Sequence, residues 1–204
     1  MPLKFVFDAN VPICLDKIKS LNETLDYMME VKDHIYINIL NLNEISNHEI
    51  KSEIKESSIC EIINHDEDSY VKFKNQLLKP AGIKPNKKDG VVLYTSHLMA
   101  VDYLVSNDLG VIDIAEKLKE KSHIENMQPF TVVGLLKYLH LSKKIPYLIF
   151  LKQSLKLFKN HEIDNIIKGI EKYQWNELDI KDRFKTYSDP IITNYGKIEG
   201  IKNE

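Results

Sequence analysis

Short apolar runs alternate with longer amphipathic segments along the first two-thirds of the chain, and this alternation limits the folds that the chain can adopt. The runs have the length of buried strands, and the segments between them repeat their apolar residues at helical spacing. Strands that alternate with helices form a parallel sheet with crossover helices, so we expect an α/β/α sandwich with a central parallel sheet. The expected strands are residues 3–7, 35–39, 59–63, 103–106 and 128–133.

The segments between these strands predict helices and one clear loop. The first segment predicts a single long helix, because apolar residues recur on one face from Val11 to Met28. Residues 79–88 contain two prolines and one glycine and are typical of a loop. Asp89 closes this loop and opens the next helix. The expected helices after the first are residues 40–55, 70–78, 89–100 and 110–121.

The pattern changes after about Leu136, where strands and helices stop alternating. Two apolar faces at helical spacing follow and predict a helical hairpin, with a further helix at residues 175–187 and an irregular tail from Pro190. The hairpin either packs on the sheet domain or supplies a contact with a partner, such as a second copy in a homodimer. Its two faces consist of Leu148, Leu151, Leu155 and Phe158, and of Ile163, Ile166, Ile167 and Ile170.

Charge divides the chain in the same way as this pattern. Residues 1–136, the expected sheet domain, hold 15 lysines and 21 acids, a net charge of −6. Residues 137–204, the expected C-terminal helical extension, hold 13 basic residues and 9 acids, a net charge of +4. An acidic front part suits a cation site, and a basic rear part suits either a polyanion partner or a solvated surface.

Composition argues against secretion and membrane insertion. No stretch approaches the roughly 18 apolar residues of a membrane span, and the N-terminus lacks the charged-then-apolar pattern of a signal peptide. Cys14 and Cys60 lie far apart in apolar contexts, and the sequence has no CxxC or Cys/His metal spacing. We therefore expect a cytoplasmic protein with reduced cysteines and no membrane partner.

Four acids stand at the ends of expected strands or at the starts of expected helices. Asp8 ends the first strand, Glu44 follows the second near the start of its helix, Asp89 opens a helix, and Asp108 ends a later strand. In a parallel sheet such positions fall on one edge, so these carboxylates meet in one crevice. Carboxylates so close repel one another unless a cation neutralises them. Oxygen ligands without Cys or His favour Mg²⁺ or Mn²⁺, and such ions suit phosphoryl chemistry.

The motifs around these acids resemble a known family. In chain order they are Phe7-Asp8-Ala9-Asn10, then Asn43-Glu44-Ile45, then Asp89 ahead of Val91-Val92-Leu93-Tyr94-Thr95-Ser96, then Leu104-Val105-Ser106-Asn107-Asp108. This ordered set resembles the PIN domain, a nuclease family of α/β sandwich proteins with a central parallel sheet. The resemblance covers about residues 3–135. It includes the 19-residue interval between the third and fourth acids.

This resemblance implies metal-dependent endonucleolytic cleavage of RNA. By the resemblance, Asp8, Glu44, Asp89 and Asp108 are the catalytic, metal-binding carboxylates. Asn10 matches a position that hydrogen-bonds near the first acid, and Ser106 matches a small hydroxyl position before the fourth. Within the family the chain is either the toxin of a toxin–antitoxin pair of the VapC kind, with a small antitoxin protein as partner, or a processing nuclease.

Each of these acids has a structural explanation as well. Glu49 and Glu53 lie on the same expected helix as Glu44, which is chosen because it is nearest to the strand end. Asp89 can serve as a helix N-cap, and Asp108 can form a turn with the glycine that follows. The ordered combination of all four favours the metal site over these separate explanations.

Two other functional classes compete with the nuclease. One is a catalytically weak PIN-like module that binds nucleic acid or protein. The other is a phosphatase or phospho-acceptor domain, which Asn10 argues against because haloacid dehalogenase phosphatases place a second Asp there. Lys84, Lys87 and Lys88 precede Asp89, and they either contact phosphates or belong to a solvated loop.

Overall fold

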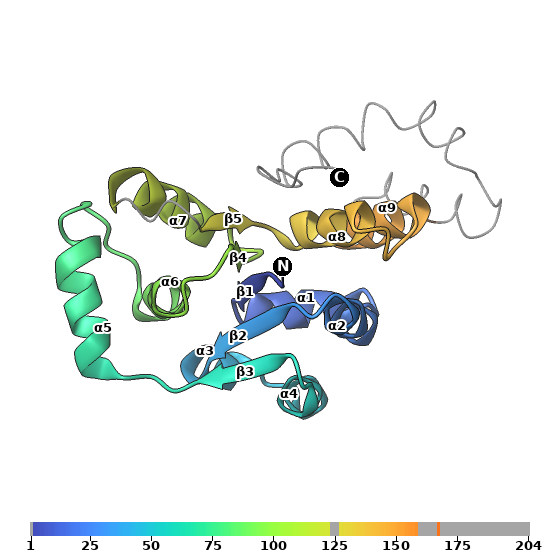
Figure 1. The fold of residues 1–204 in the computed structure, drawn as a ribbon, viewed down its shortest axis with the longest axis horizontal. Helices are drawn as coiled ribbons and strands as arrows, with labels where there is room; N and C mark the ends of the chain where they lie inside the picture. The colour runs from blue at the N-terminus through green and yellow to red at the C-terminus, as the bar shows by residue number, and fades with distance from the viewer. Residues whose placement is uncertain (1, 123–126, 159–166, 168–204) are drawn as a thin grey trace. The chain divides into compact units, whose positions relative to one another are not determined.

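The computed structural model describes residues 2–122, 127–158 and 167 (Figure 1). Five strands form one parallel sheet with the order β3-β2-β1-β4-β5, and helices flank this sheet. The predicted α/β sandwich with a central parallel sheet is therefore confirmed. The strands are β1 (Lys4–Phe7), β2 (His34–Asn38), β3 (Cys60–Ile63), β4 (Tyr103–Val105) and β5 (Gln128–Phe130).

The helices connect these strands and continue beyond the last one. They are α1 (Asn10–Lys17), α2 (Leu21–Glu30), α3 (Ile39–Glu44), α4 (His48–Glu56), α5 (Glu67–Phe73), the π-helix η1 (Lys74–Leu78), α6 (Lys87–Leu98), α7 (Leu109–Ser122), α8 (Val132–Leu141) and α9 (Tyr147–Lys156).

Strand register sorts the sheet residues onto two apolar faces. Val6 pairs with Tyr36 and Leu104, and these side chains share one buried cluster with residues of α5, η1, α6 and α7. Phe5 points to the opposite face, because successive side chains of a strand alternate. There its ring stacks on Tyr103 at 5.1 Å between centroids. Both faces of the sheet are thus apolar, as a buried parallel sheet requires.

The order of the strands places a topological switch point between β1 and β4. From β1 the chain proceeds to β2 and β3 on one side, and then returns to build β4 and β5 on the other side. Phe7 and Val105 form the last pair of the two central strands, and the N–H of Asp8 donates to the Val105 carbonyl at 3.0 Å. Ligands of open α/β sheets bind at such a point, outside the carboxyl ends of the strands.

Two predicted helices are each divided in the structure. The expected long helix from Val11 to Met28 is wrong, because Lys19 adopts a left-handed φ of 58° and separates α1 from α2. The expected helix at residues 40–55 is likewise two helices. Asn47 starts the second one, since its Oδ1 accepts from the N–H of Glu49 at 2.8 Å.

Three predicted boundaries also differ. The helix expected at residues 70–78 starts earlier, at Glu67, and its last turn is the π-helix η1. Helix α6 begins at Lys87 rather than at Asp89, because Asn86 caps it. Strand β5 ends at Phe130, so residues 132–133 are helical instead of extended.

The chain divides into two compact units, Met1–Thr131 and Val132–Glu204. The expected domain boundary after residue 136 falls within α8. In the second unit α8 and α9 pack together through the ring of His140, which stacks on Phe150 at 5.6 Å between centroids. The expected second arm of the hairpin (apart from Ile167), the helix at 175–187 and the tail lie outside the described residues.

No helix in the described part of the chain has both the length and the apolar character needed to cross a lipid bilayer.

Candidate functional site

Asp8 is the most enclosed acid at the switch point, with 8 % of its surface exposed. Strand β1 ends one residue before it, so its side chain lies at the carboxyl edge of the central strand. Its Oδ1 accepts from the Ala9 N–H at 2.7 Å. Its Oδ2 accepts from Asn10 Nδ2 and from Ser106 Oγ, both at 2.7 Å. Three donors therefore hold the carboxylate in one orientation.

Asn10 and Ser106 join the segment after β1 to the segment after β4. The Asn10 Oδ1 accepts from the backbone N–H of Asn107 at 2.8 Å. The Ser106 Oγ accepts from the backbone N–H of Asp108 at 3.1 Å and from Asn10 Nδ2 at 3.2 Å. Asp108 Oδ1 in turn accepts from the Gly110 N–H at 2.7 Å, at the start of α7. The structure thus brings Asp8, Asn10, Ser106 and Asp108 into one hydrogen-bonded network.

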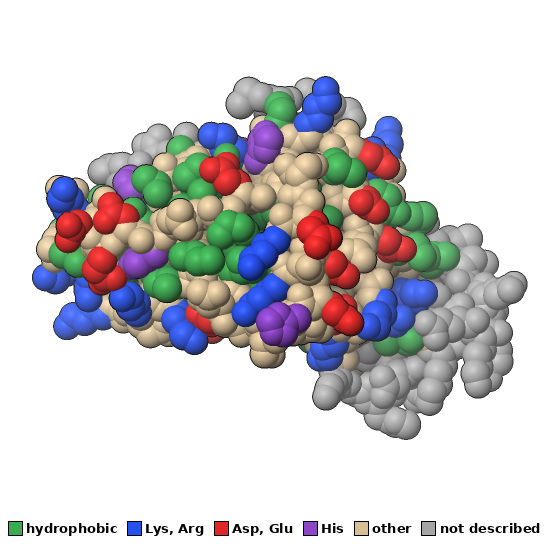
Figure 2. All heavy atoms as spheres, turned by 90° about the horizontal axis from the view of Figure 1, so that it is seen from below, with side chains coloured by type: hydrophobic (Ala, Val, Ile, Leu, Met, Phe, Trp, Pro, Cys, Tyr) green, Lys and Arg blue, Asp and Glu red, His purple; other side chains and the backbone are tan. Residues whose placement is uncertain are grey.

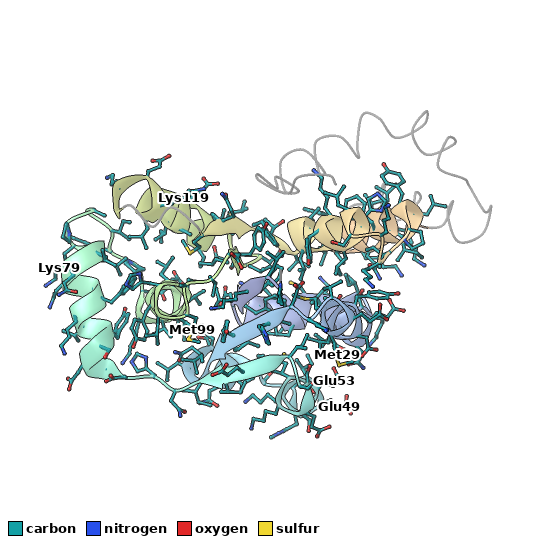
Figure 3. All side chains as sticks on the ribbon, viewed as in Figure 1. Met29, Glu49, Glu53, Lys79, Met99 and Lys119 are labelled. Atoms are coloured by element: carbon teal, nitrogen blue, oxygen red, sulfur yellow. The ribbon has the colours of Figure 1, made fainter. Side chains whose placement is uncertain are left out.

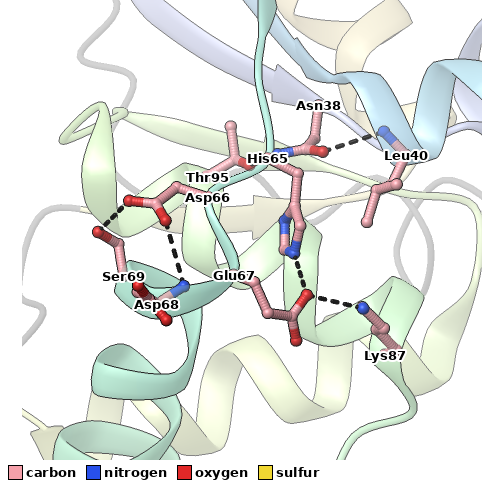
Figure 4. Close-up of polar contacts among 9 residues, drawn as sticks. All are labelled: Asn38, Leu40, His65, Asp66, Glu67, Asp68, Ser69, Lys87 and Thr95. Atoms are coloured by element: carbon pink, nitrogen blue, oxygen red, sulfur yellow. Dashed lines mark hydrogen bonds and ion pairs between the residues drawn. The ribbon is translucent and has the colours of Figure 1, made fainter.

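Glu44 is placed by the short helix that follows β2. Asn38 starts this helix: its Oδ1 accepts from the Leu40 N–H at 3.0 Å, and its Nδ2 donates to Thr95 Oγ1 of α6 at 3.1 Å (Figure 4). Glu44 is the last residue of α3, so its expected place near the start of a helix is wrong. Its Oε2 lies 3.3 Å from Lys88 Nζ, while its Oε1 is buried without a hydrogen-bond partner among the described residues.

Asp89 lies in the first turn of α6 and does not cap it. Asn86 is the cap, because its Oδ1 accepts from the Asp89 N–H at 3.0 Å, and its Nδ2 donates to Asp89 Oδ2 at 2.7 Å. The next residue, Gly90, sits directly under Tyr70 of α5, where a Cβ would collide with the tyrosine hydroxyl. Asp89 is therefore not the N-cap of α6, and Asn86 holds its carboxylate by a hydrogen bond.

The four predicted acids act on one another electrostatically. Burial raises the pKa of Asp8, and the charges of Glu44 and Asp89 raise it further, against the effect of its hydrogen bonds. Burial also raises the pKa of Asp89, with the charges of Asp108 and Glu44 adding to the rise and Lys88 opposing it. Every one of the four acids therefore interacts with at least one other, and Asp89 interacts with all three.

The alternative acids lie elsewhere. Glu53 Oε1 accepts from Asn22 Nδ2 of α2 at 3.3 Å, and Glu49 is exposed in the first turn of α4; Figure 3 shows both side chains on α4. Asp102 Oδ2 accepts from the Lys4 N–H at 2.8 Å, at the amino end of β1 and β4. Glu44, rather than Glu49 or Glu53, is therefore the glutamate that we group with Asp8 and Asp89, because its charge raises the pKa of both.

The donor chemistry of the four acids fits a hard divalent cation such as Mg²⁺ or Mn²⁺. All their ligand atoms are carboxylate oxygens, and Glu44 Oε1 is a buried acceptor with no partner among the described residues. An added positive charge would relieve the repulsion that raises the pKa of Asp8 and of Asp89. Within residues 2–122, 127–158 and 167, no group of three or more His, Cys, Asp or Glu side chains could hold a metal ion in the positions that they occupy. Side chains would therefore have to close around an ion.

The two cysteines add no soft ligand to this set. Both are free thiols, and burial raises the pKa of Cys60 to about 11 and also raises the pKa of Cys14. Neutral thiols bind metals poorly, because the thiolate is the ligand. The carboxylates are thus the groups at this edge that suit a cation.

Three residues of the site escaped the sequence-based prediction of roles: Asn38, Asn86 and Asn107. Asn38 carried a usable signal, since it is a polar residue at the end of an apolar strand. Asn86 and Asn107 act through contacts that depend on loop geometry, and composition does not reveal such contacts. Lys88 was predicted, with Lys84 and Lys87, either to contact phosphates or to belong to a solvated loop, but its ion pair with Glu44 was not predicted.

Comparison of the chain with protein-family models, with curated proteins and with solved structures found no match. A function for this chain is therefore inferred from the sheet topology and from the side chains at the switch point.

Proposed function

We propose that this chain is a metal-dependent endoribonuclease of the PIN type, which hydrolyses phosphodiester bonds of RNA at the switch point between β1 and β4. The observation that carries the proposal is the hydrogen-bonded link from Asp8 through Ser106 to Asp108 at that edge. Glu44 and Asp89 lie near enough for their charges to raise the pKa of Asp8. Acids that only stabilise a fold are usually paired with cations or spread apart, because clustered carboxylates repel. A bound divalent cation would offset the repulsion among these four carboxylates.

In this proposal the four carboxylates hold Mg²⁺ or Mn²⁺, and neighbouring donors keep them in place. Asn10 and Ser106 fix Asp8, Asn86 fixes Asp89, and the Gly110 N–H fixes Asp108. These hydrogen bonds restrict Asp8, Asp89 and Asp108 before an ion arrives, which limits the movement that closing around it would require.

A divalent cation at this edge supplies activation of the attacking water and neutralisation of the charge on the phosphate. The chain would supply the orientation of the carboxylates that hold the cation, through the hydrogen bonds to Asp8, Asp89 and Asp108. Hydrolysis then breaks the bond between phosphorus and one ribose oxygen, and water adds to the phosphorus.

RNA would be attracted by positive side chains near the four acids, not by the net charge of the chain. Acidic and basic side chains are interspersed on the face that Figure 2 presents. The net charge of the whole chain is −2. Lys88, in contrast, lies in the first turn of α6 next to Asp89, and its Nζ is 3.3 Å from Glu44 Oε2. Cations beside an acid cluster are the arrangement expected for a phosphate-containing substrate.

The experiment for this proposal is cleavage of a mixed pool of structured and unstructured RNA with Mg²⁺ or Mn²⁺. The parent chain is compared with an Asp8→Asn/Asp108→Asn variant and with the parent in excess chelator. We expect cutting that requires the metal and disappears in the variant. RNA binding without any cutting, whichever metal is added, would instead favour the PIN-like binding module.

Three further predictions from the sequence accompany this proposal: a cytoplasmic location, a homodimer and, from the resemblance, a role as a toxin with a small antitoxin partner. Size-exclusion chromatography of the full chain tests the homodimer. Growth arrest on expression of the parent, but not of the Asp8→Asn/Asp108→Asn variant, tests the toxin role.

A further inference from the structure

Lys88 lies beside two of the four acids, Glu44 and Asp89. Its Nζ is 3.3 Å from Glu44 Oε2, and 65 % of its side chain is exposed. It immediately precedes Asp89, whose pKa its charge lowers. The lysine therefore interacts with two of the four acids at once.

The neighbouring lysine has a different partner. Lys87 Nζ lies 2.8 Å from Glu67 Oε2, and His65 Nε2 lies 2.8 Å from the same oxygen (Figure 4). Glu67 opens α5 and belongs to no pair of the acid cluster. Two consecutive lysines with similar exposure, 57 % and 65 %, are thus held by different acids. Lys87 provides a matched control for Lys88.

Lys88 pairs with only one of the two carboxylate oxygens of Glu44. The ion pair uses Oε2, whereas Oε1 is buried with no hydrogen-bond partner among the described residues. A buried carboxylate oxygen without a partner is destabilising, because it loses its hydration and gains no hydrogen bond in return. One flexible ammonium group at the rim of the site therefore neutralises Glu44 incompletely, and a cation placed among the carboxylates would satisfy the remaining oxygen.

We propose that Lys88 acts in two states of the site: it neutralises Glu44 when no divalent cation is bound, and it binds a non-bridging phosphate oxygen of the RNA when the cation takes its place. This inference rests on the proposed function. The ammonium and the divalent cation compete for Glu44, so binding of the cation frees the lysine. Because Lys88 precedes Asp89 in the chain, the freed ammonium stays beside the cluster, where the phosphate must lie.

The physical cost of this exchange is small. The lysine side chain is 65 % exposed, so water screens its ion pair with Glu44 and a divalent cation readily offsets the loss of that pair. Lysine has a long flexible stem and carries a compact charge that suits phosphate oxygens. Lys88 would therefore be a substrate-binding residue rather than a metal ligand.

The test compares Lys88→Met, Lys88→Arg and Lys87→Met in the full chain. Calorimetric titration of Mn²⁺ without RNA measures the competition directly. We expect Lys88→Met to bind Mn²⁺ about two- to fivefold more tightly than the parent, because the competing ammonium is gone. Lys87→Met is expected to match the parent.

The second readout is kcat/KM for a single-stranded RNA as a function of KCl concentration. Lys88→Met should lower kcat/KM by about 10- to 100-fold, and should reduce the slope of log kcat/KM against log salt by about 0.7. Lys88→Arg should restore most of the loss, and Lys87→Met should leave both quantities unchanged.

The outcomes separate this inference from the proposed function. A parent that binds Mn²⁺ and cuts RNA, with a Lys88→Met variant that behaves like Lys87→Met, overturns the role of Lys88 alone. Weaker Mn²⁺ binding by Lys88→Met also overturns it. A parent that neither binds Mn²⁺ nor cuts RNA overturns the proposed function and this inference together.

Discussion

The hydroxyl of Ser106 donates to Asp8 Oδ2 at 2.7 Å across 98 residues of chain. The two residues follow the last paired positions of β4 and β1, so parallel register alone brings them side by side. The same hydroxyl accepts from the N–H of Asp108 at 3.1 Å. One small side chain therefore links the first predicted acid to the fourth.

Replacing Ser106 by alanine should disturb the site more than an equivalent buried serine elsewhere. Ser106→Ala removes one donor from Asp8 and leaves the Asp108 N–H without its acceptor, which should cost about 1 to 3 kcal/mol of the free energy of unfolding. Ser96→Ala is the matched control, because Ser96 Oγ donates to the Val92 carbonyl within α6 at 2.8 Å. Urea denaturation measures both. Equal losses in the two variants would contradict the linking role of Ser106.

The pH dependence of stability should report the buried charge of Asp8. Burial and neighbouring acids raise its pKa in the folded chain above the ordinary aspartate value of 3.8, so the folded state binds the proton more tightly than the unfolded state does. Stability without metal must then fall as pH rises from about 4 to the raised pKa, and this contribution is constant above it.

Asp8→Asn removes this titration. The free energy of unfolding of the parent minus that of Asp8→Asn should therefore decrease as pH rises through this range. Urea denaturation in chelator at several pH values measures the difference. A difference that grows with rising pH would mean that the folded chain favours the ionised form.

Glu44 and Glu49 should respond differently to replacement. With Mn²⁺ at about 100 times its dissociation constant, the parent should gain about 2.7 kcal/mol of stability, or roughly 5 to 10 °C in Tm. Glu44→Gln should lose most of this gain, whereas Glu49→Gln should keep it, because Glu49 is exposed on α4. Thermal unfolding with and without Mn²⁺ measures both. A full gain in Glu44→Gln would exclude Glu44 as a ligand.

The contact of Gly90 with Tyr70 should be visible in a double-mutant cycle. A Cβ at Gly90 would collide with the Tyr70 hydroxyl, so Gly90→Ala should destabilise the chain by about 1 to 3 kcal/mol. Tyr70→Phe removes the hydroxyl and should recover part of this loss in the double variant. Additive losses, measured by chemical denaturation, would show that the two residues do not share this contact.

The strands and the sheet could be predicted from sequence because apolar runs of strand length are local signals. Helix breaks could not: Lys19 turns the chain with a left-handed φ although the apolar repeat continues through Leu21 and Leu25. Tertiary packing of α2 decides that break. The start of α6 was misplaced for a similar reason, since both Asn86 and Asp89 are good capping residues and only the hydrogen bonds show which of them caps.

The acids of the site could be chosen from sequence because strand ends gather at one edge. Their supports could not be assigned in full. The bond from the Asn107 N–H to Asn10 and the ion pair between Lys88 and Glu44 depend on how helix ends and loops from distant parts of the chain pack together. Short-range sequence patterns carry no information about such long-range contacts.

Calorimetric titration of Mn²⁺ into the metal-free chain tests the central claim most directly, with Asp8→Asn/Asp108→Asn as the paired variant. The account predicts saturable binding to the parent and little or none to the variant, whose fold is checked by circular dichroism. Equal binding by both chains, or no binding by the parent, would contradict a cation site formed by Asp8, Glu44, Asp89 and Asp108.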